Sequence, residues 1–274
     1  MARMVRIYSA NSEFQRLEVL KSNRNKRHQH NEFFVEGVRN ISETVKNGWS
    51  ITGIIYSAER ELSEWAKGVI RANQVAVHYV LTKLLMKKLS DKEETSELLA
   101  TVSIPKDDLS RIILGTRPFV AVFDRPSSRG NLGTVIRSCD ALGCQGLIIS
   151  GHAVDLYDPE TIRATTGSFF SMPSVRVDSH KEFAEWIASI KSRYGDLQIV
   201  GTSAHAEDYV ENCDWTKPTV LLLGNETHGL SYAYKEISDT LVKIPIGGSA
   251  TSLNVACAAS ILLYEAARQR KYRR

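Results

Sequence analysis

The sequence predicts an α/β protein of two domains. At 274 residues the chain is long for one domain and suits two. Predicted strands and helices alternate along the chain, and continuous apolar strands such as Val220–Leu223 indicate a parallel sheet covered on both faces. A polar segment between Pro105 and Pro118 has little periodicity. We therefore expect a smaller N-terminal α/β domain over residues 1–105, a linker over 106–116 and a doubly wound C-terminal domain over 117–274.

The N-terminal elements follow from apolar residues at helical spacing, such as Phe14, Leu17 and Leu20, and from short apolar runs. These patterns predict helices over 12–21, 37–47, 61–72 and 81–89 and strands over 31–37, 51–57, 75–80 and 98–104.

The C-terminal elements follow from the same two patterns and alternate more regularly. They predict strands over 119–123, 146–150, 198–203, 220–223 and 241–246 and helices over 134–142, 159–165, 181–193 and 253–270. No internal repeat or low-complexity segment interrupts them.

The composition, with 43% hydrophobic and 24% charged residues, is that of a folded protein and not of a disordered chain. No apolar run approaches the roughly 18 residues of a membrane span, and the first residues lack the apolar core of a signal peptide. We therefore expect a cytoplasmic protein with no membrane partner. Its cysteines occur singly, which predicts reduced thiols and neither a metal site nor a disulfide framework.

The positive charge is concentrated in two places, although the formal net charge is only +4. One is the C-terminus, with Arg268, Arg270, Lys271, Arg273 and Arg274, and the other is a run with Lys21, Arg24, Lys26, Arg27, His28 and His30. Such clusters attract nucleic-acid phosphates. A solvated terminus and a solvated loop explain each cluster equally well when it is taken alone.

Three polar segments carry the candidate chemistry, and each follows a predicted strand of the C-terminal domain. Neither a dinucleotide-binding glycine fingerprint nor a phosphate-binding loop is present in the sequence. The segments over 124–143, 221–231 and 244–259 instead lie where open α/β sheets bind ligands, at the carboxyl ends of the strands.

The first segment contains Asn131, which we expect to cap a helix, and Arg137 on the first turns of that helix. An arginine near a helix N-terminus opposes the helix dipole, so an anionic substrate explains Arg137 better than helix stability does.

The second and third segments place glycines beside polar residues. Glu226 directly follows a buried strand and needs a partner there, whereas His228 fits an exposed loop. Ser252 is a good cap for the last helix, but a cap leaves Ile244-Pro-Ile-Gly-Gly248 unexplained.

Together, and in this order, the segments resemble the SpoU, or TrmH, branch of the SPOUT RNA methyltransferases. Asn131-x-Gly133-x-x-x-Arg137 is similar to that family's first motif, and Leu221-x-x-Gly224-x-Glu226-x-x-Gly229-Leu230 to its second. Ile244-Pro-Ile246 followed by Ser252-Leu-Asn-Val255 is similar to its third, although Ile246 stands where the family usually has Met. The resemblance covers Phe119 to Arg270. More loosely, the front half resembles the substrate-binding domain that many members carry.

The resemblance implies a trefoil-knotted C-terminal domain that binds S-adenosylmethionine and methylates a ribose 2′-hydroxyl of RNA. The residues it implies for the cofactor are Thr202, Gly224, Asn225, Ile244, Ile246 and Leu253. Those it implies for catalysis are Arg137, Asn131, Glu226, Ser252 and Asn254, and Arg137 is the proposed base. Because the pKa of an arginine exceeds about 12, we hold more firmly that Arg137 positions the ribose or its phosphate. Candidate RNA contacts are Arg24, Lys26, Arg27, Arg39 and Arg163.

The resemblance further implies a homodimer formed through the knotted domain. The last helix offers Val255, Ala259, Leu262 and Leu263 as an apolar face for that contact, with its basic end exposed to RNA. An rRNA substrate is favoured over tRNA because of the added front domain. The alternatives are a SPOUT enzyme that methylates an RNA base and a non-catalytic RNA-binding or ribosome-assembly protein.

Overall fold

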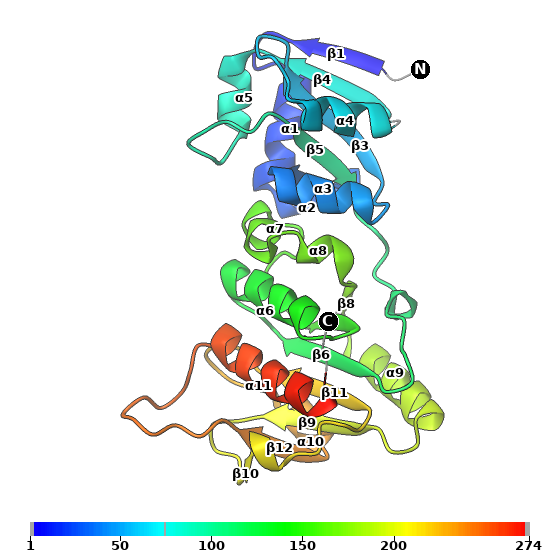
Figure 1. Cartoon of the computed structure of the whole chain (residues 1–274), viewed down its shortest axis with the longest axis vertical. Coiled ribbons are helices and arrows are strands. Elements are labelled where there is room, and N and C mark those ends of the chain that lie inside the picture. Colours follow the sequence, from blue (N-terminus) through cyan, green and yellow to red (C-terminus); the bar gives the residue numbers. More distant parts are fainter. Residues whose placement is uncertain (1–2, 74, 272–274) are drawn as a thin grey trace. The chain divides into compact units, whose positions relative to one another are not determined.

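A computed structural model describes residues 3–73 and 75–271, which form two compact units (Figure 1). Unit 1 holds the residues up to Lys106 together with Asp155–Ser171, and unit 2 holds Asp107–Val154 and the residues from Met172 onward. Within the described ranges, no helix is both long enough and apolar enough to cross a membrane.

Unit 1 is built on a mixed five-stranded sheet. Its strands, in spatial order, are β1 (Arg3–Ile7), β4 (Val77–Leu81), β3 (Ile51–Ser57), β5 (Leu99–Ser103) and β2 (Glu32–Glu36). The first three are parallel, whereas β5 runs antiparallel to both of its neighbours. Apolar side chains from the sheet and the helices, such as Phe14, Phe34 and Ile55, are almost fully buried and form its core.

The helices of unit 1 are short and mostly capped by side chains. They are α1 (Ser12–Ser22), α2 (Arg24–His30), α3 (Val38–Lys46), α4 (Glu64–Ala72), α5 (Lys83–Leu89), α7 (Pro159–Thr165) and α8 (Ser168–Ser171). The basic run, for which no helix was predicted, forms α2, because the Asn23 side chain accepts a hydrogen bond from the Lys26 amide at 3.1 Å and caps it.

An aromatic cluster holds α7 and α8 in unit 1. The rings of Phe33 and Trp49 pack against those of Tyr157, Phe169 and Phe170 at centroid distances between 5.1 and 6.4 Å. The Trp49 indole also donates to the Phe170 carbonyl oxygen at 2.9 Å. Residues 155–171 were predicted within the C-terminal domain from their order along the chain, but these apolar contacts give them their neighbours in unit 1.

Unit 2 is built on an all-parallel seven-stranded sheet. In spatial order its strands are β10 (Asp208–Tyr209), β12 (Thr240–Lys243), β9 (Gln198–Thr202), β11 (Thr219–Leu223), β6 (Phe119–Asp124), β7 (Gly146–Ser150) and β8 (Ser174–Val177). Every residue of β6, β7 and β11 is buried, as their continuous apolar sequences require. The predicted α/β fold with a parallel sheet is therefore confirmed.

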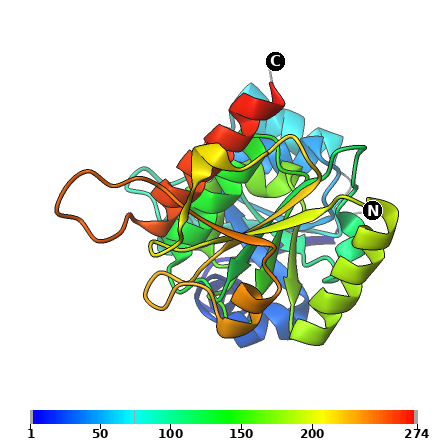
Figure 2. The same cartoon turned by 90° about the horizontal axis from the view of Figure 1, so that it is seen from below.

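The helices of unit 2 are α6 (Arg129–Ala141), α9 (His180–Arg193), α10 (Tyr232–Glu236) and α11 (Val255–Arg270). Short 3₁₀ turns occur at Leu109–Arg111 and Val210–Asn212. The long loop between β12 and α11 extends away from the sheet (Figure 2). The elements that were not predicted are mostly short or exposed ones, namely β1, α2, α8, β8 and β10.

Candidate active site

A cavity of about 330 Å³ lies at the carboxyl ends of β9, β11 and β12 in unit 2. Parallel strands end at one edge of their sheet, so loops far apart in sequence meet there. The residues predicted to hold the cofactor all line this cavity: Thr202, Gly224, Asn225, Ile244, Ile246 and Leu253. Glu226 and Ser252, predicted as catalytic residues, line it as well.

The loop after β11 is a tight turn fixed by its own hydrogen bonds. Asn225 and Gly229 exchange both backbone hydrogen bonds at 3.0 Å, and the Asn225 side-chain oxygen accepts from the amides of Thr227 and His228. A Cβ atom on Gly224 would lie 2.4 Å from the backbone nitrogen of Leu230. Glycine is therefore required at 224, because any side chain would push the turn away from the strand.

Glu226 reaches from this turn to the start of α6. Its carboxylate accepts from the Ser127 amide and hydroxyl at 2.9 and 2.8 Å, from the Ser128 amide at 3.0 Å and from the Asn131 side chain at 3.2 Å. Burial acts to raise the pKa of Glu226, but the hydrogen bonds from Ser127 and Asn131 outweigh it and leave that pKa below its ordinary value. Glu226 is therefore an anionic anchor and a poor proton acceptor near neutral pH.

Asn131 connects Glu226 to α11. Its side-chain oxygen accepts from the Asn254 side-chain nitrogen at 3.2 Å, while its own nitrogen donates to Glu226. Thus three of the five predicted catalytic residues form one chain of hydrogen bonds at the cavity. Because amide groups both donate and accept, this chain can orient a bound hydroxyl group without changing its own charge.

The caps of the two helices differ from those predicted. The Ser128 hydroxyl caps α6, so Asn131 lies inside the first turn. Likewise α11 is capped by Asn254, whose side-chain oxygen accepts from the amides of Ala256 and Cys257, and not by Ser252. Both predictions were wrong. The cap of α6 lies three residues before Asn131, and the cap of α11 lies two residues after Ser252.

Asp124 and Arg125, at the end of β6, support the loop of the site and were not predicted, since the Asn225 side chain donates to the Arg125 carbonyl oxygen at 2.6 Å. The Asp124 side chain is 1% exposed and accepts from the Arg125 guanidinium at 2.9 and 3.0 Å and from the Ser231 amide at 2.8 Å. The hydrogen bonds to Asp124 raise the pKa of Arg125 further. An acidic residue directly after a buried strand was the available signal, the same one that identified Glu226.

Comparison with known proteins assigns both parts of the chain. Residues 118–264 match the SpoU rRNA Methylase family, and residues 11–100 match the SpoU L30e-like domain. The chain belongs to the SpoU rRNA methylase family. The resemblance drawn from the three motifs is therefore confirmed.

Several relatives of this SpoU chain extend over nearly its whole length. A 23S rRNA (uridine(2479)-2′-O)-methyltransferase of Streptomyces viridochromogenes is 46% identical over 97% of this chain and 92% of the relative. A crystal structure of the SpoU methyltransferase AviRb from the same organism, in complex with AdoMet, has a TM-score of 0.89 at 44% identity, covering 95% of this chain and 99% of the other. RlmP of Bacillus subtilis, a 23S rRNA (guanosine(2553)-2′-O)-methyltransferase, is 26% identical over 85% of this chain and 88% of the relative.

In this SpoU chain the cavity suits an adenosine-bearing cofactor. Ile246 and Leu253 line it yet remain 38% and 39% exposed, so an apolar ring could cover them. The close approach at Gly224 leaves backbone groups next to the same space. These features match a ligand with a flat apolar body and hydrogen-bonding edges.

Arg137 lies on the exposed side of α6, two turns beyond Asn131. It does not belong to the described lining of the cavity. The axial rise of a helix puts it about 9 Å along α6 from Asn131. The Ser138 hydroxyl next to it bonds the Ser260 hydroxyl at 2.8 Å, which ties this part of α6 to α11.

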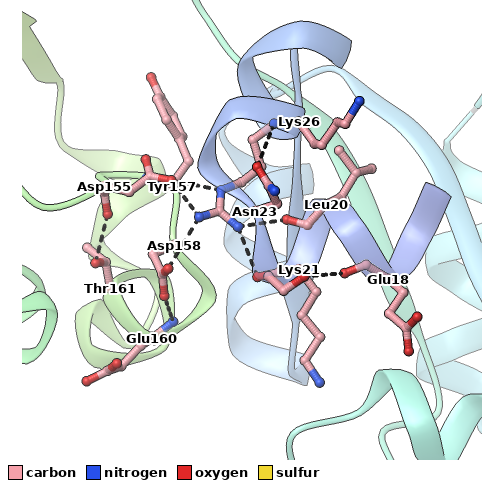
Figure 3. A network of polar contacts seen from close by, with 12 residues as sticks. Glu18, Leu20, Lys21, Asn23, Lys26, Asp155, Tyr157, Asp158, Glu160 and Thr161 are labelled. Atoms are coloured by element: carbon pink, nitrogen blue, oxygen red, sulfur yellow. Dashed lines mark hydrogen bonds and ion pairs between the residues drawn. The ribbon is translucent and has the colours of Figure 1, made fainter. Parts of the chain in front are cut away.

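Arg27, predicted to contact RNA, is buried in unit 1 and 1% exposed. Its guanidinium donates to Asp155 at 2.6 and 2.8 Å, to Asp158 at 3.3 Å and to the carbonyl oxygens of Leu20 and Lys21 at 2.9 Å (Figure 3). The prediction was wrong, because a residue without accessible surface cannot reach a phosphate. The other predicted RNA contacts, Lys26, Arg39, Arg163 and Arg24, lie wholly or partly exposed in unit 1.

The basic C-terminus also differs from the prediction. Arg270 is 4% exposed and donates to the carbonyl oxygens of Trp215 at 2.6 Å and Arg117 at 2.9 Å, while its guanidinium packs over the Phe119 ring at 4.7 Å. Arg268 pairs with Glu265 at 2.7 Å. Arg273 and Arg274 lie outside the described residues. Arg270 thus holds the end of α11 against the sheet and is not available to RNA.

Proposed function

We propose that this chain transfers a methyl group from S-adenosylmethionine to a ribose 2′-hydroxyl of RNA, and that its substrate is 23S rRNA. The observation that carries the proposal is the hydrogen-bonded chain from Asn254 through Asn131 to Glu226 at the rim of the cavity. The choice of substrate is supported by two relatives that are 2′-O-methyltransferases of 23S rRNA.

The cofactor, when bound, supplies a methyl group that its sulfonium already activates. Thr202, Gly224, Asn225, Ile244, Ile246 and Leu253 would hold it, mainly through backbone groups and apolar contact. The chain's remaining task is to align the ribose oxygen and to exclude competing water.

Asn131 and Asn254 orient the ribose hydroxyl in this proposal, and the charge of Glu226 fixes both amides. Arg137 holds the ribose or its 3′- or 5′-phosphate, since a guanidinium stays protonated and offers several donors in a planar fork. The lowered pKa of Glu226 makes it a poor base, so we assign removal of the hydroxyl proton to solvent.

The test is methylation of unmodified 23S rRNA and tRNA by the purified protein with labelled S-adenosylmethionine, followed by nucleoside analysis. Label in a 2′-O-methylated nucleoside of 23S rRNA is the expected result. Label on a base would favour a SPOUT base methyltransferase, and cofactor binding without any transfer would favour an assembly protein that only binds RNA.

The variant Arg137→Ala separates positioning from cofactor binding. We expect transfer to fall at least about 100-fold, because an oriented reactant contributes several kcal/mol, while the cofactor dissociation constant by calorimetry stays within twofold. Equal loss of both would contradict the role given to Arg137.

The fold implied by the motifs and its assembly are further parts of the proposal. The C-terminal domain, residues 117–274, forms a trefoil knot and dimerises, while residues 1–105, joined by a linker over 106–116, bind the RNA in the cytoplasm. The face predicted for the dimer needs correction, since Ala259, Leu262 and Leu263 are buried within the chain itself. Val255 of the predicted face stays partly exposed, and Ile261 and Tyr264, which are 40% and 60% exposed on α11, are further apolar residues that a partner can reach.

A further inference from the structure

A second cavity, of about 290 Å³, lies entirely within unit 1. It is enclosed by the end of β2, the start of α3, the loop after α5 and helix α7. Its lining combines three cationic side chains with an apolar wall: Arg39, Lys92 and Arg163 with Phe34, Val38 and Ile162. The active-site cavity shares none of these residues.

The three cations have no acidic partner among the described residues. Two acids line the same cavity: Asp91 pairs with Lys21 at 2.6 Å, and Glu36 accepts from the neutral donors of Ser90, Ser96 and the Asp91 amide. In the described part of the chain, neither forms an ion pair with the three cations. Lys92 extends its ammonium group over Gly37, 3.3 Å from where a Cβ atom would stand. Arg39 lies along Gly167, and its Nε is 3.6 Å from the position that a Cβ atom on Gly167 would take. Gathering unpaired cations costs free energy unless an anion binds between them.

The start of α3 adds donors to the same space. The helix is nine residues long, and Gly37 at its N-cap supplies no side-chain hydrogen bond to the first free amides. Free amides at a helix N-terminus favour an anion. The free amides and the three cations therefore both favour a phosphate group as the ligand.

Asn40 supplies an independent sign of a ligand. Its side chain is 7% exposed and lines the cavity, its nitrogen donates to the Glu36 carbonyl oxygen at 3.0 Å, and its oxygen has no hydrogen-bond partner among residues 3–73 and 75–271. A buried acceptor left without a donor is unfavourable, because it has lost its hydrogen bonds to water. A ligand that brings an N–H or O–H group next to its phosphate would satisfy it, as a nucleotide does.

The surroundings favour an RNA strand over a free nucleotide. A third cavity, of about 470 Å³, shares Val38 and Lys92 with this one and is lined by Trp65 together with one further cation and two acids, Arg60, Glu94 and Glu97. The Glu97 carboxylate accepts from the Ser63 amide and hydroxyl, each at 2.7 Å. Val38 is 56% exposed between them, so the two cavities form one groove with an apolar ridge. A groove with cations in one part and an indole in the next suits successive nucleotides of a single strand, whose bases stack on aromatic and apolar side chains.

We propose that this groove binds an unpaired segment of the substrate RNA, with one phosphate held by Arg39, Lys92 and Arg163 and with its nucleoside donating to Asn40. The inference rests on the proposed function for the identity of the RNA. It adds an anchoring site, distinct from the cavity in unit 2, whose residues the motifs did not identify except for Arg39 and Arg163.

The first test is the double variant Arg39→Ala/Lys92→Ala, with Lys87→Ala/Lys88→Ala on the exposed face of α5 as the charge-matched control. Binding of unmodified 23S rRNA transcript is measured by filter retention at several salt concentrations. We expect the dissociation constant to rise at least about tenfold in the double variant alone, and the slope of its logarithm against log salt to fall by about one, because one phosphate contact is lost. An unchanged dissociation constant, or an equal change in the control, would overturn the proposal.

The second test is Val38→Glu, with Val38→Gln as its uncharged control. Glutamate in the first turn of α3 suits the helix dipole, so circular dichroism should show both variants folded. We expect KM for 23S rRNA to rise at least about tenfold in Val38→Glu while kcat changes less than twofold. Loss of kcat without a change in KM would contradict an anchoring role.

Two controls separate the outcomes. If the wild-type protein methylates neither RNA, the proposed function fails, whereas the binding measurement still tests the groove. If uridine or adenosine monophosphate binds the wild-type protein by calorimetry as tightly as the transcript does, and the double variant loses both, the groove is a free-nucleotide site and the assignment to RNA is overturned.

Discussion

At the scale of single residues, Glu226 carries the most information. It is an acid at the end of a buried strand, and its two oxygens receive four hydrogen bonds from the start of α6. Because these donors stabilise the ionised form, they outweigh the effect of burial, and the pKa of Glu226 is lowered. The residue therefore joins the two loops more strongly in its charged state than in its neutral one.

The variant Glu226→Gln tests this role through its pH dependence. A carboxyl whose pKa is lower in the folded state contributes stability above its unfolded pKa of about 4.3, and the contribution is lost as the pH falls through the lower, folded value. We expect the variant to lose about 1 to 2 kcal/mol of unfolding free energy at pH 7, and the difference from wild type to shrink in the acidic range. Urea unfolding at several pH values measures it.

Methyl transfer should fall at least about tenfold in the same variant, because Asn131 and Asn254 lose their charged anchor. Glu207→Gln, at an exposed position of unit 2, is the matched control. A deficit in Glu226→Gln that stayed constant from pH 7 to the acidic range would mean that the charge of Glu226 does not hold the loops.

At the scale of elements, the start of α11 contributes both to the stability of a helix and to the arrangement of the site. Asn254 uses its oxygen to cap the helix and its nitrogen to contact Asn131, while Ser252, two residues earlier, lines the cavity and caps nothing. One side chain thus sets both where the helix begins and where the hydrogen-bonded chain ends.

Substitutions at these two positions should separate stability from activity. Asn254→Ala should cost about 1 kcal/mol through the lost cap, whereas Asn254→Asp should keep the cap and lose only the donor to Asn131. Thermal unfolding and methyl transfer, measured side by side, should therefore show Asn254→Asp stable and impaired. Ser252→Ala should unfold like wild type, and a loss of stability there comparable to Asn254→Ala would restore Ser252 as the cap.

At the scale of the whole molecule, the chain relies on contacts between residues that are far apart in sequence. Arg27 and Asp155 are 128 positions apart, and their side chains are 1% and 5% exposed. Removing one partner of a buried ion pair leaves an uncompensated charge in the interior.

We expect Arg27→Ala to lose about 3 to 5 kcal/mol of unfolding free energy for that reason, and Arg27→Met/Asp155→Leu to regain most of it by removing both charges. Lys26→Ala, at the exposed neighbouring position, is the control and should unfold like wild type. Unfolding by urea measures all three. Unchanged stability in Arg27→Ala, combined with weaker RNA binding, would return Arg27 to the set of RNA contacts.

The sequence by itself determined the α/β class, most of the strands and helices, and the three segments that form the site. These follow from local periodicity and from residue types at fixed spacing, which short stretches of chain carry on their own. Gly224 is an example, since its place in the second motif already put it among the residues expected at the cofactor.

Only the tertiary structure decided which charged residues are buried and which polar groups meet. Arg27 and Arg270 look like surface cations in the sequence, yet acids and carbonyl groups from distant segments enclose them. Asn131, Glu226 and Asn254 come together only because parallel strands end at one edge of the sheet. Burial and partners depend on packing across the whole chain, and no local pattern encodes them.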